Sequence, residues 1–278
     1  MLEFLLAIGV KAVATGAFVL AMAVLIERAP PVVAAASIGF PVVVGPGFFL
    51  VALQQSTPFL AQAAANAVLT FVATLVFMVV IGRWFARLGV APLLALGVGA
   101  WAITAFLVTS SALELPWSLV LFALAFAGSH LILPFTFTPV PVPPPTPALR
   151  RRPPFGRAIQ AGLFVALVTY AADALGERVT AALLTMPVAM IFLTVELKHR
   201  LSSADGERIF RWGRMGLVAL VSFVLTIHLA AASLGNVPAA LLAFATSVGV
   251  AIAVVGTERL LSPRLKDWAA RARDRAWR

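Results

Sequence analysis

Helix-breaking residues lie in the middle of two apolar segments of this sequence. The segment AAASIGFPVVVGPGFFLVAL carries five of them: Gly39, Pro41, Gly45, Pro46 and Gly47. A later segment, AALLTMPVAMIFL, carries Thr185 and Pro187. Proline removes a backbone hydrogen bond and glycine adds backbone freedom, so a helix at either place should break or kink. Inside a membrane, interrupted helices present their ends to a substrate or ion.

These breakers define the predicted substrate-binding residues: Gly39, Pro41, Gly45, Pro46, Thr185 and Pro187. An alternative remains open, in which the prolines only kink packed helices and the glycines allow close helix approach.

Ionisable residues inside apolar segments are a second kind of candidate, because charge in hydrocarbon is costly. Lys11 and Glu27 have the same spacing as Arg157 and Asp173. That spacing corresponds to about 24 Å along a helix, so the two members of each pair should lie at opposite ends of a span. Glu27 and Asp173 are the predicted ion-coupling residues. Snorkelling of these side chains to the interface is the alternative.

Other chemistry has little support in the sequence. There are no cysteines, and His130, His199 and His228 are far apart without a metal-binding spacing. No phosphate-binding loop, dinucleotide fingerprint or nucleophile elbow occurs. We therefore predict no catalytic residues, no metal, no cofactor and no enzymatic activity.

The composition indicates a membrane protein. Of the 278 residues, 62% are hydrophobic and 12% charged, and the mean hydropathy is +1.01. In soluble domains about half of the residues are hydrophobic and about a quarter are charged. The net charge of +10 comes from short basic clusters between apolar runs, a pattern of membrane-face loops rather than of nucleic-acid binding. The predicted fold is an all-α, polytopic transmembrane bundle in the lipid bilayer.

About nine segments are apolar and long enough to span a bilayer, which takes roughly 20 residues. They are 2–26, 31–53, 59–82, 90–111, 115–135, 158–176, 179–197, 212–234 and 237–257. With nine spans, all of the 21 Lys and Arg except Lys11 and Arg178 fall on one face. The positive-inside rule makes that face cytoplasmic. The predicted location is the inner membrane, with the N-terminus outside and the C-terminus in the cytoplasm.

An internal repeat divides the chain. Residues 11–110 align without a gap on 157–256, which places Pro41 on Pro187 and LGxxP at 88–92 on LGxxP at 234–238. Each copy holds four spans and a fifth lies between them, so the second copy should be inverted. The predicted units are repeat 1 (1–111), a connecting span (112–135), a proline-rich basic linker (136–156), repeat 2 (157–257) and a basic tail (258–278).

The block 34–105 resembles the small four-span bacterial inner-membrane proteins of the GlpM type. The shared features are a small-residue run leading into Gly39-Phe40-Pro41, and Pro92 followed by AWAITA at 100–105. The second copy departs from this pattern, with Thr185-Met186 before its proline. The resemblance implies an inner-membrane protein and assigns no substrate.

Two functions follow as hypotheses. The first is a small secondary transporter or exporter that binds a small molecule or ion between the repeats. The second is a non-transporting scaffold or accessory subunit in envelope lipid or polysaccharide assembly. In the tail, Leu261, Leu265, Trp268 and Ala272 share one helical face beside arginines. This pattern predicts an interfacial helix on anionic lipid headgroups.

Overall fold

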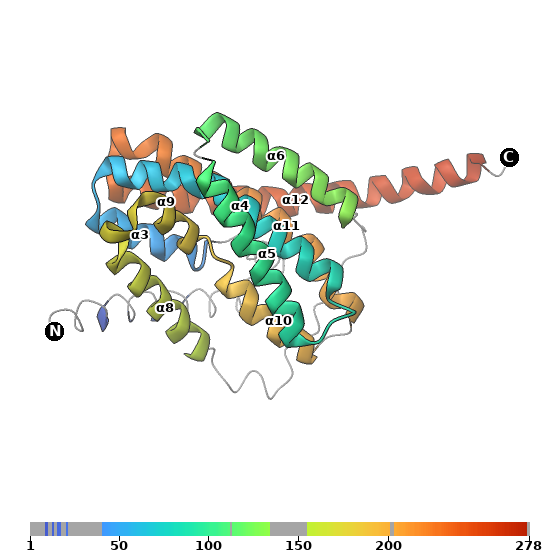
Figure 1. Ribbon diagram of the computed structural model, residues 1–278. Coiled ribbons are helices and arrows are strands. Elements are labelled where there is room, and N and C mark those ends of the chain that lie inside the picture. The colour runs from blue at the N-terminus through green and yellow to red at the C-terminus, as the bar shows by residue number, and fades with distance from the viewer. Residues whose placement is uncertain are drawn as a thin grey trace.

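The computed structural model describes residues 41–111, 113–133, 155–200 and 203–276, together with a few single positions before residue 41. All regular structure in these residues is α-helical (Figure 1). The helices are α3 (Val44–Gln54), α4 (Thr57–Trp84), α5 (Val90–Ser110), α6 (Leu115–Ile132), α8 (Phe155–Tyr170), α9 (Ala172–Leu184), α10 (Val188–Arg200), α11 (Ser203–Leu234) and α12 (Asn236–Ala276).

Six stretches of the described residues are long and apolar enough to cross a membrane. They are Thr57–Trp84, Val90–Ser110, Leu115–Ile132, Ala172–Val195, Ile209–Leu234 and Asn236–Val254. The predicted spans 59–82, 90–111, 115–135, 212–234 and 237–257 each correspond to one of them. These helices are compatible with an integral membrane protein.

For the other predicted spans, the structure either describes only part of the span or places its boundary elsewhere. Span 2–26 and the first half of span 31–53 lie outside the continuously described residues, and α3 is the second half of the latter. The predicted boundary between spans 158–176 and 179–197 is different in the structure. There α8 ends at Tyr170, and Gly176 has a φ of 71°. Glycine adopts this left-handed conformation without a Cβ clash, so the chain turns between these residues.

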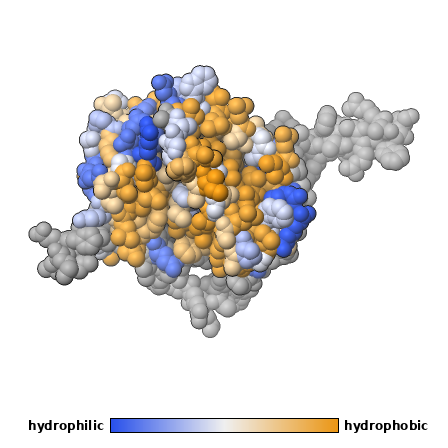
Figure 2. Space-filling view, viewed as in Figure 1, coloured by the Kyte–Doolittle hydropathy of each residue, from blue (hydrophilic) through white to orange (hydrophobic). Residues whose placement is uncertain are grey.

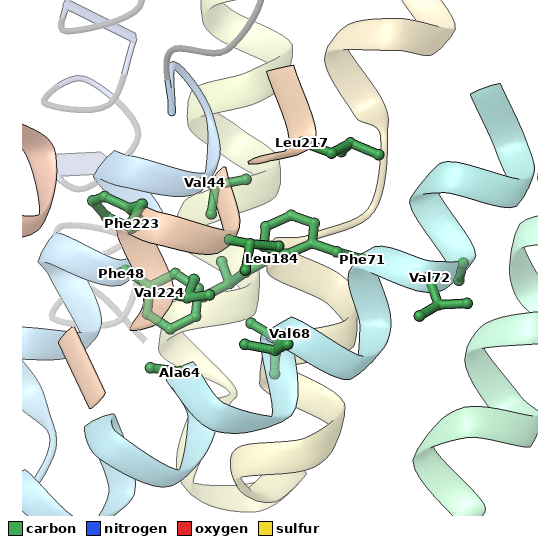
Figure 3. Packing of buried hydrophobic residues seen from close by; sticks show 14 of the residues in the cluster. Val44, Phe48, Ala64, Val68, Phe71, Val72, Leu184, Leu217, Phe223 and Val224 are labelled. Carbon is green, nitrogen blue, oxygen red and sulfur yellow. The ribbon is translucent and has the colours of Figure 1, made fainter. Parts of the chain in front are cut away.

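Helix α4 forms the centre of the bundle. It begins at Ser56, whose side chain accepts a hydrogen bond from the amide of Phe59 and caps the helix. It packs against α5, α6, α9 and α11. Of the residues in its most apolar stretch, 89% are buried. The buried core includes Val68, Phe71 and Val72 from α4 with Phe223 and Val224 from α11 (Figure 3).

The outer helices expose apolar side chains. Of the residues in the most apolar stretch of each helix, only 22% are buried in α5 and 17% in α6. Phe106 is 71% exposed and Leu124 67%. Hydrophobic residues cover most of the face shown in Figure 2, with hydrophilic patches near its margin. A surface of this kind suits hydrocarbon rather than water.

Helices α4 and α11 pack side by side in opposite directions. At one end, Nδ1 of His228 lies 2.9 Å from the carbonyl oxygen of Ala61. At the other end, a Cβ on Gly82 would meet Phe210 at 3.2 Å. The helix starts also follow the aligned repeat: Thr57 aligns with Ser203, and Val90 with Asn236. Helix α12 continues without a break into the predicted tail, as far as Ala276.

Candidate functional site

The first predicted helix break lies just before α3, and the residues that precede Pro41 lie outside the described ones. Pro41, Val42 and Val43 are not helical, and α3 begins at Val44. Two backbone bonds close this turn, from the amide of Gly45 to the oxygen of Pro41 (2.7 Å) and from the amide of Gly47 to the oxygen of Val43 (3.3 Å). Pro41, Gly45 and Pro46 are all buried. Gly39 and Glu27 lie outside the described residues.

The second interruption separates α9 from α10. Helix α9 ends at Leu184 and α10 begins at Val188, with Thr185, Met186 and Pro187 between them. Pro187 has no amide hydrogen and its ring clashes with the preceding turn, so the helix stops before it. The break expected from the sequence at Pro187 is therefore present.

The start of α3 and the interruption between α9 and α10 meet inside the bundle. A Cβ on Gly47 would lie 2.6 Å from Cδ2 of Leu184, and one on Gly45 would lie 2.8 Å from the ring of Phe244. Figure 3 shows Val44 and Phe48 near Leu184 in this region. We call this meeting point, formed by residues 41–47 and 184–187, the crossing. It is tightly packed, because any side chain larger than hydrogen at Gly45 or Gly47 would have to displace a neighbour.

Two threonines of α4 support the second interruption. The hydroxyl oxygens of Thr70 and Thr185 are 2.8 Å apart, and the hydroxyl of Thr74 donates to the carbonyl oxygen of Thr185 at 2.8 Å. The three residues are between 0% and 5% exposed. Our sequence reading missed Thr70 and Thr74. Asn66, Thr70 and Thr74 follow one another at intervals of four residues in an apolar helix, so they share one face. That spacing was the available signal.

Helices α9 and α10 run parallel to α4. Thr185 lies beside Thr70 and Thr74, and the ammonium of Lys198 donates to the carbonyl oxygen of Phe85 at the end of α4. Thr180 therefore lies toward the same end of the bundle as Asn66.

Three buried polar atoms near this level have no hydrogen-bond partner among the described residues: Nδ2 of Asn66, Nε1 of Trp101 and Oγ1 of Thr180. Trp101 belongs to the single buried stripe of α5, which faces α4. Two of these atoms are N–H donors and the third is a hydroxyl. Buried atoms of this kind usually have a partner, so each one needs an explanation.

The described candidate for ion coupling lies away from the crossing. Asp173 is exposed in the first turn of α9, three turns before Thr185. A carboxylate there is favourably placed against the helix N-terminus. The structure therefore does not bring Asp173 to the predicted substrate-binding residues.

His130 and His228 each contact a backbone carbonyl oxygen. Nδ1 of His130 lies 2.8 Å from the oxygen of Phe126 in its own helix, and His228 contacts Ala61 as described above. No group of three or more potential metal ligands occurs in the part of the chain that the structure describes.

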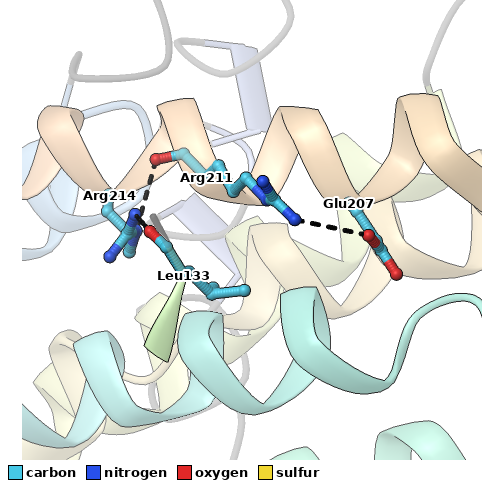
Figure 4. Close-up of polar contacts among 4 residues, drawn as sticks. All are labelled: Leu133, Glu207, Arg211 and Arg214. Carbon is cyan, nitrogen blue, oxygen red and sulfur yellow. Dashed lines mark hydrogen bonds and ion pairs between the residues drawn. The ribbon is translucent and has the colours of Figure 1, made fainter. Parts of the chain in front are cut away.

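A second polar cluster lies at the end of the bundle where α4 and α6 terminate. Arg214 is fully buried and donates from Nη1 to the carbonyl and hydroxyl oxygens of Ser129 (2.7 and 2.6 Å) and from Nη2 to the oxygen of Leu133 (2.6 Å). Its Nε donates to the backbone carbonyl oxygen of Arg211 (3.3 Å), and the Arg211 guanidinium is paired with the Glu207 carboxylate at 3.6 Å (Figure 4). Arg214 thus holds the last turn of α6 and Leu133, the residue that follows the helix, against α11.

Comparison with protein-family models, curated proteins and solved structures finds no match to this chain. The resemblance to the GlpM type therefore stays a prediction.

Proposed function

We propose that this protein is a small secondary transporter or exporter whose substrate binds at the crossing between two inverted repeats. The proposal assigns Gly39, Pro41, Gly45, Pro46, Thr185 and Pro187 to the site. It adds Thr70 and Thr74, which contact Thr185 directly.

Two features support the inverted arrangement. Helices α4 and α11 occupy equivalent places in the aligned repeats and begin at aligned residues, and they pack in opposite directions. Pro41, in the non-helical turn before α3, also aligns with Pro187 at the interruption between α9 and α10. An antiparallel pair of equivalent helices is what a repeat with an odd number of intervening spans produces.

One observation carries the proposal: the non-helical turn that precedes α3 in the first half meets the interruption between α9 and α10 of the second half, deep in the bundle beside buried hydroxyls. Non-helical backbone at membrane depth persists only where protein or a polar cavity covers it. The donors of Asn66 and Trp101 favour a solute that presents hydrogen-bond acceptors. Asp173 and Glu27 remain proposed coupling groups, which would act at a distance from this solute.

Solvent access to the crossing tests the proposal without knowledge of the substrate. The chain has no cysteine, so a single introduced cysteine is the only thiol. In a transporter, the crossing opens to each side in turn. We therefore expect Thr185→Cys in sealed vesicles to react with a membrane-impermeant maleimide from both faces.

Two variants serve as controls. Phe106→Cys, on the exposed apolar face of α5, should react from neither face because lipid covers it. Arg178→Cys, on an exposed residue two positions after the kink at Gly176 in α9, should react from one face only. If Thr185→Cys reacts from neither face although the protein is folded, the transport proposal is wrong.

The tight packing of the crossing favours the second candidate, a membrane scaffold or accessory subunit. In that case the basic tail would hold a partner protein. Pull-down of the full chain and of a chain lacking 259–278 separates the two functions. A partner lost with the tail, together with an unreactive Thr185→Cys, would establish the scaffold.

We also propose an inner-membrane location with the C-terminus in the cytoplasm. The structure gathers Arg87, Lys198 and Arg214 at one end of the bundle. It gathers Gln55 and Asn236 at the other, joined by a 2.8 Å bond from Nδ2 of Asn236. Arg87→Cys should therefore react with the maleimide only from the cytoplasmic face and Gln55→Cys only from outside.

A further inference from the structure

An exposed tryptophan at the end of α4 lies between two arginines. The guanidinium carbon of Arg83 is 5.9 Å from the ring centroid of Trp84, and that of Arg87 is 5.5 Å from it. The turn after α4 holds this arrangement, because the amides of Arg87 and Leu88 both donate to the carbonyl oxygen of Trp84. Trp84 is 38% exposed, and both arginines are exposed.

The positive charge of these arginines is not neutralised by the described residues. The described acidic side chains are Glu114, Asp173, Glu177 and Glu207. Glu207 pairs with Arg211, and the other three belong to loops or helix starts elsewhere in the chain.

The next helix adds a favourable field for an anion. Helix α5 begins at Val90, three residues after Arg87, with Gly89 at its N-cap. Gly89 offers no side-chain cap, and the first turn holds no acidic residue. The free amides and the dipole of such a helix start favour negative charge.

From these contacts we infer that Arg83, Trp84 and Arg87 bind the phosphate headgroup of an anionic phospholipid. Helix α4 has 28 residues and is about 42 Å long, which places its end at headgroup level. The apolar face of α5, with Leu96 44% and Ile103 65% exposed, lies beside this point and suits the acyl chains. A free phosphate ion would gain nothing from that apolar face, so a lipid is the occupant the structure favours.

Native mass spectrometry of the delipidated full-length protein tests the inference. The probes are phosphatidylglycerol, phosphatidylcholine and inorganic phosphate. Each basic residue near an anionic surface contributes about a fivefold change in affinity, so Arg83→Gln/Arg87→Gln should weaken phosphatidylglycerol binding about 30-fold. Phosphatidylcholine binding should be weaker than that of phosphatidylglycerol in the parent and unchanged in the double variant.

Three controls make the result decisive. Arg178→Gln removes an exposed arginine elsewhere and should leave phosphatidylglycerol binding within about twofold. Trp84→Leu keeps both charges but removes the ring that positions them, so it should weaken binding by an intermediate factor. Unfolding temperatures of all variants should match the parent, because these side chains are exposed.

The inference is overturned if the double variant retains the parent's affinity, or if Arg178→Gln weakens binding as much. It is also overturned if inorganic phosphate displaces phosphatidylglycerol completely, since the site would then recognise the free ion. None of these readouts depends on transport, so this result and that of the cysteine experiment are independent.

Discussion

The end of the bundle that carries Arg87, Lys198 and Arg214 is called the cationic end here. It and the crossing are held together in different ways. At the cationic end, Arg214 and Lys198 place charged donors on the terminal carbonyls of α6 and α4. At the crossing, the interhelical polar contacts that the structure gives for Thr185 are neutral bonds with Thr70 and Thr74. A neutral hydrogen bond contributes about 1 kcal/mol and one to a charged group about 2 kcal/mol.

This difference indicates where the protein can move. Contacts worth about 1 kcal/mol each can be exchanged during a transport cycle, whereas a buried arginine with several carbonyl partners cannot easily be withdrawn. Any rearrangement should therefore exchange the contacts of Thr185 at the crossing while Arg214 stays bound to the end of α6. Substitutions at the cationic end should therefore lower the free energy of unfolding more than substitutions at the crossing.

Arg214→Gln should have the largest effect. The variant leaves the carbonyls of Ser129 and Leu133 without their charged donor inside the bundle. We expect the free energy of unfolding in detergent to fall by about 3 kcal/mol. Arg211→Gln removes a partly exposed i,i+4 pair with Glu207, and loss of that pair should cost about 0.5 kcal/mol. Equal losses in the two variants would show that Arg214 does not hold α6.

Gly206→Ala should come next, since it probes packing at the same end. A Cβ there would lie 2.0 Å from Cε1 of Phe85, which is fully buried. Overpacking of this kind costs about 2 kcal/mol. Gly128 has no neighbour within 4 Å of an added Cβ, so Gly128→Ala should be neutral or stabilise α6 by up to about 1 kcal/mol. A neutral Gly206→Ala would mean that α11 approaches α4 less closely at this end.

Thr74→Val tests a hydrogen bond at the crossing. It removes the donor to the carbonyl of Thr185, an oxygen at a helix interruption, and should cost about 1 kcal/mol. Thr104 donates only to Ala100 in its own helix, so Thr104→Val should cost less than about 0.5 kcal/mol. A loss from Thr74→Val as large as that from Arg214→Gln would remove the contrast between the two regions.

The positions of the helix breaks were largely predictable from the sequence. Pro187 and Gly235 act through their own backbones, and the structure shows a break at the first and a positive φ at the second. Apolar length likewise predicted α4, α5 and α6 closely, because hydrophobic thickness constrains span length.

The tertiary roles of single polar residues were not predictable in the same way. Arg214 was counted among the basic residues of a cytoplasmic loop, but it is buried against α6. That role depends on where α6 ends in space, which hydropathy does not encode. Thr70 and Thr74 seemed ordinary in an apolar helix until the fold brought Thr185 to them, and Asp173 lies away from the crossing because the chain turns before Gly176.

Asn66→Leu should have the smallest effect on stability. It tests which role the unpartnered donors near the crossing have. Nδ2 of Asn66 has no partner among the described residues, whereas Nδ2 of Asn236 donates to Gln55 at 2.8 Å. Replacing an unsatisfied buried amide by an apolar group of similar size should change the free energy of unfolding by less than about 0.5 kcal/mol, while Asn236→Leu should lower it by about 1 kcal/mol. Such a result would mean that folding does not need Asn66, which leaves solute binding as its role and strengthens the transport proposal. Equal losses in the two variants would show that Asn66 is satisfied within the fold, and the crossing would then be a packed structural contact of the kind a scaffold uses.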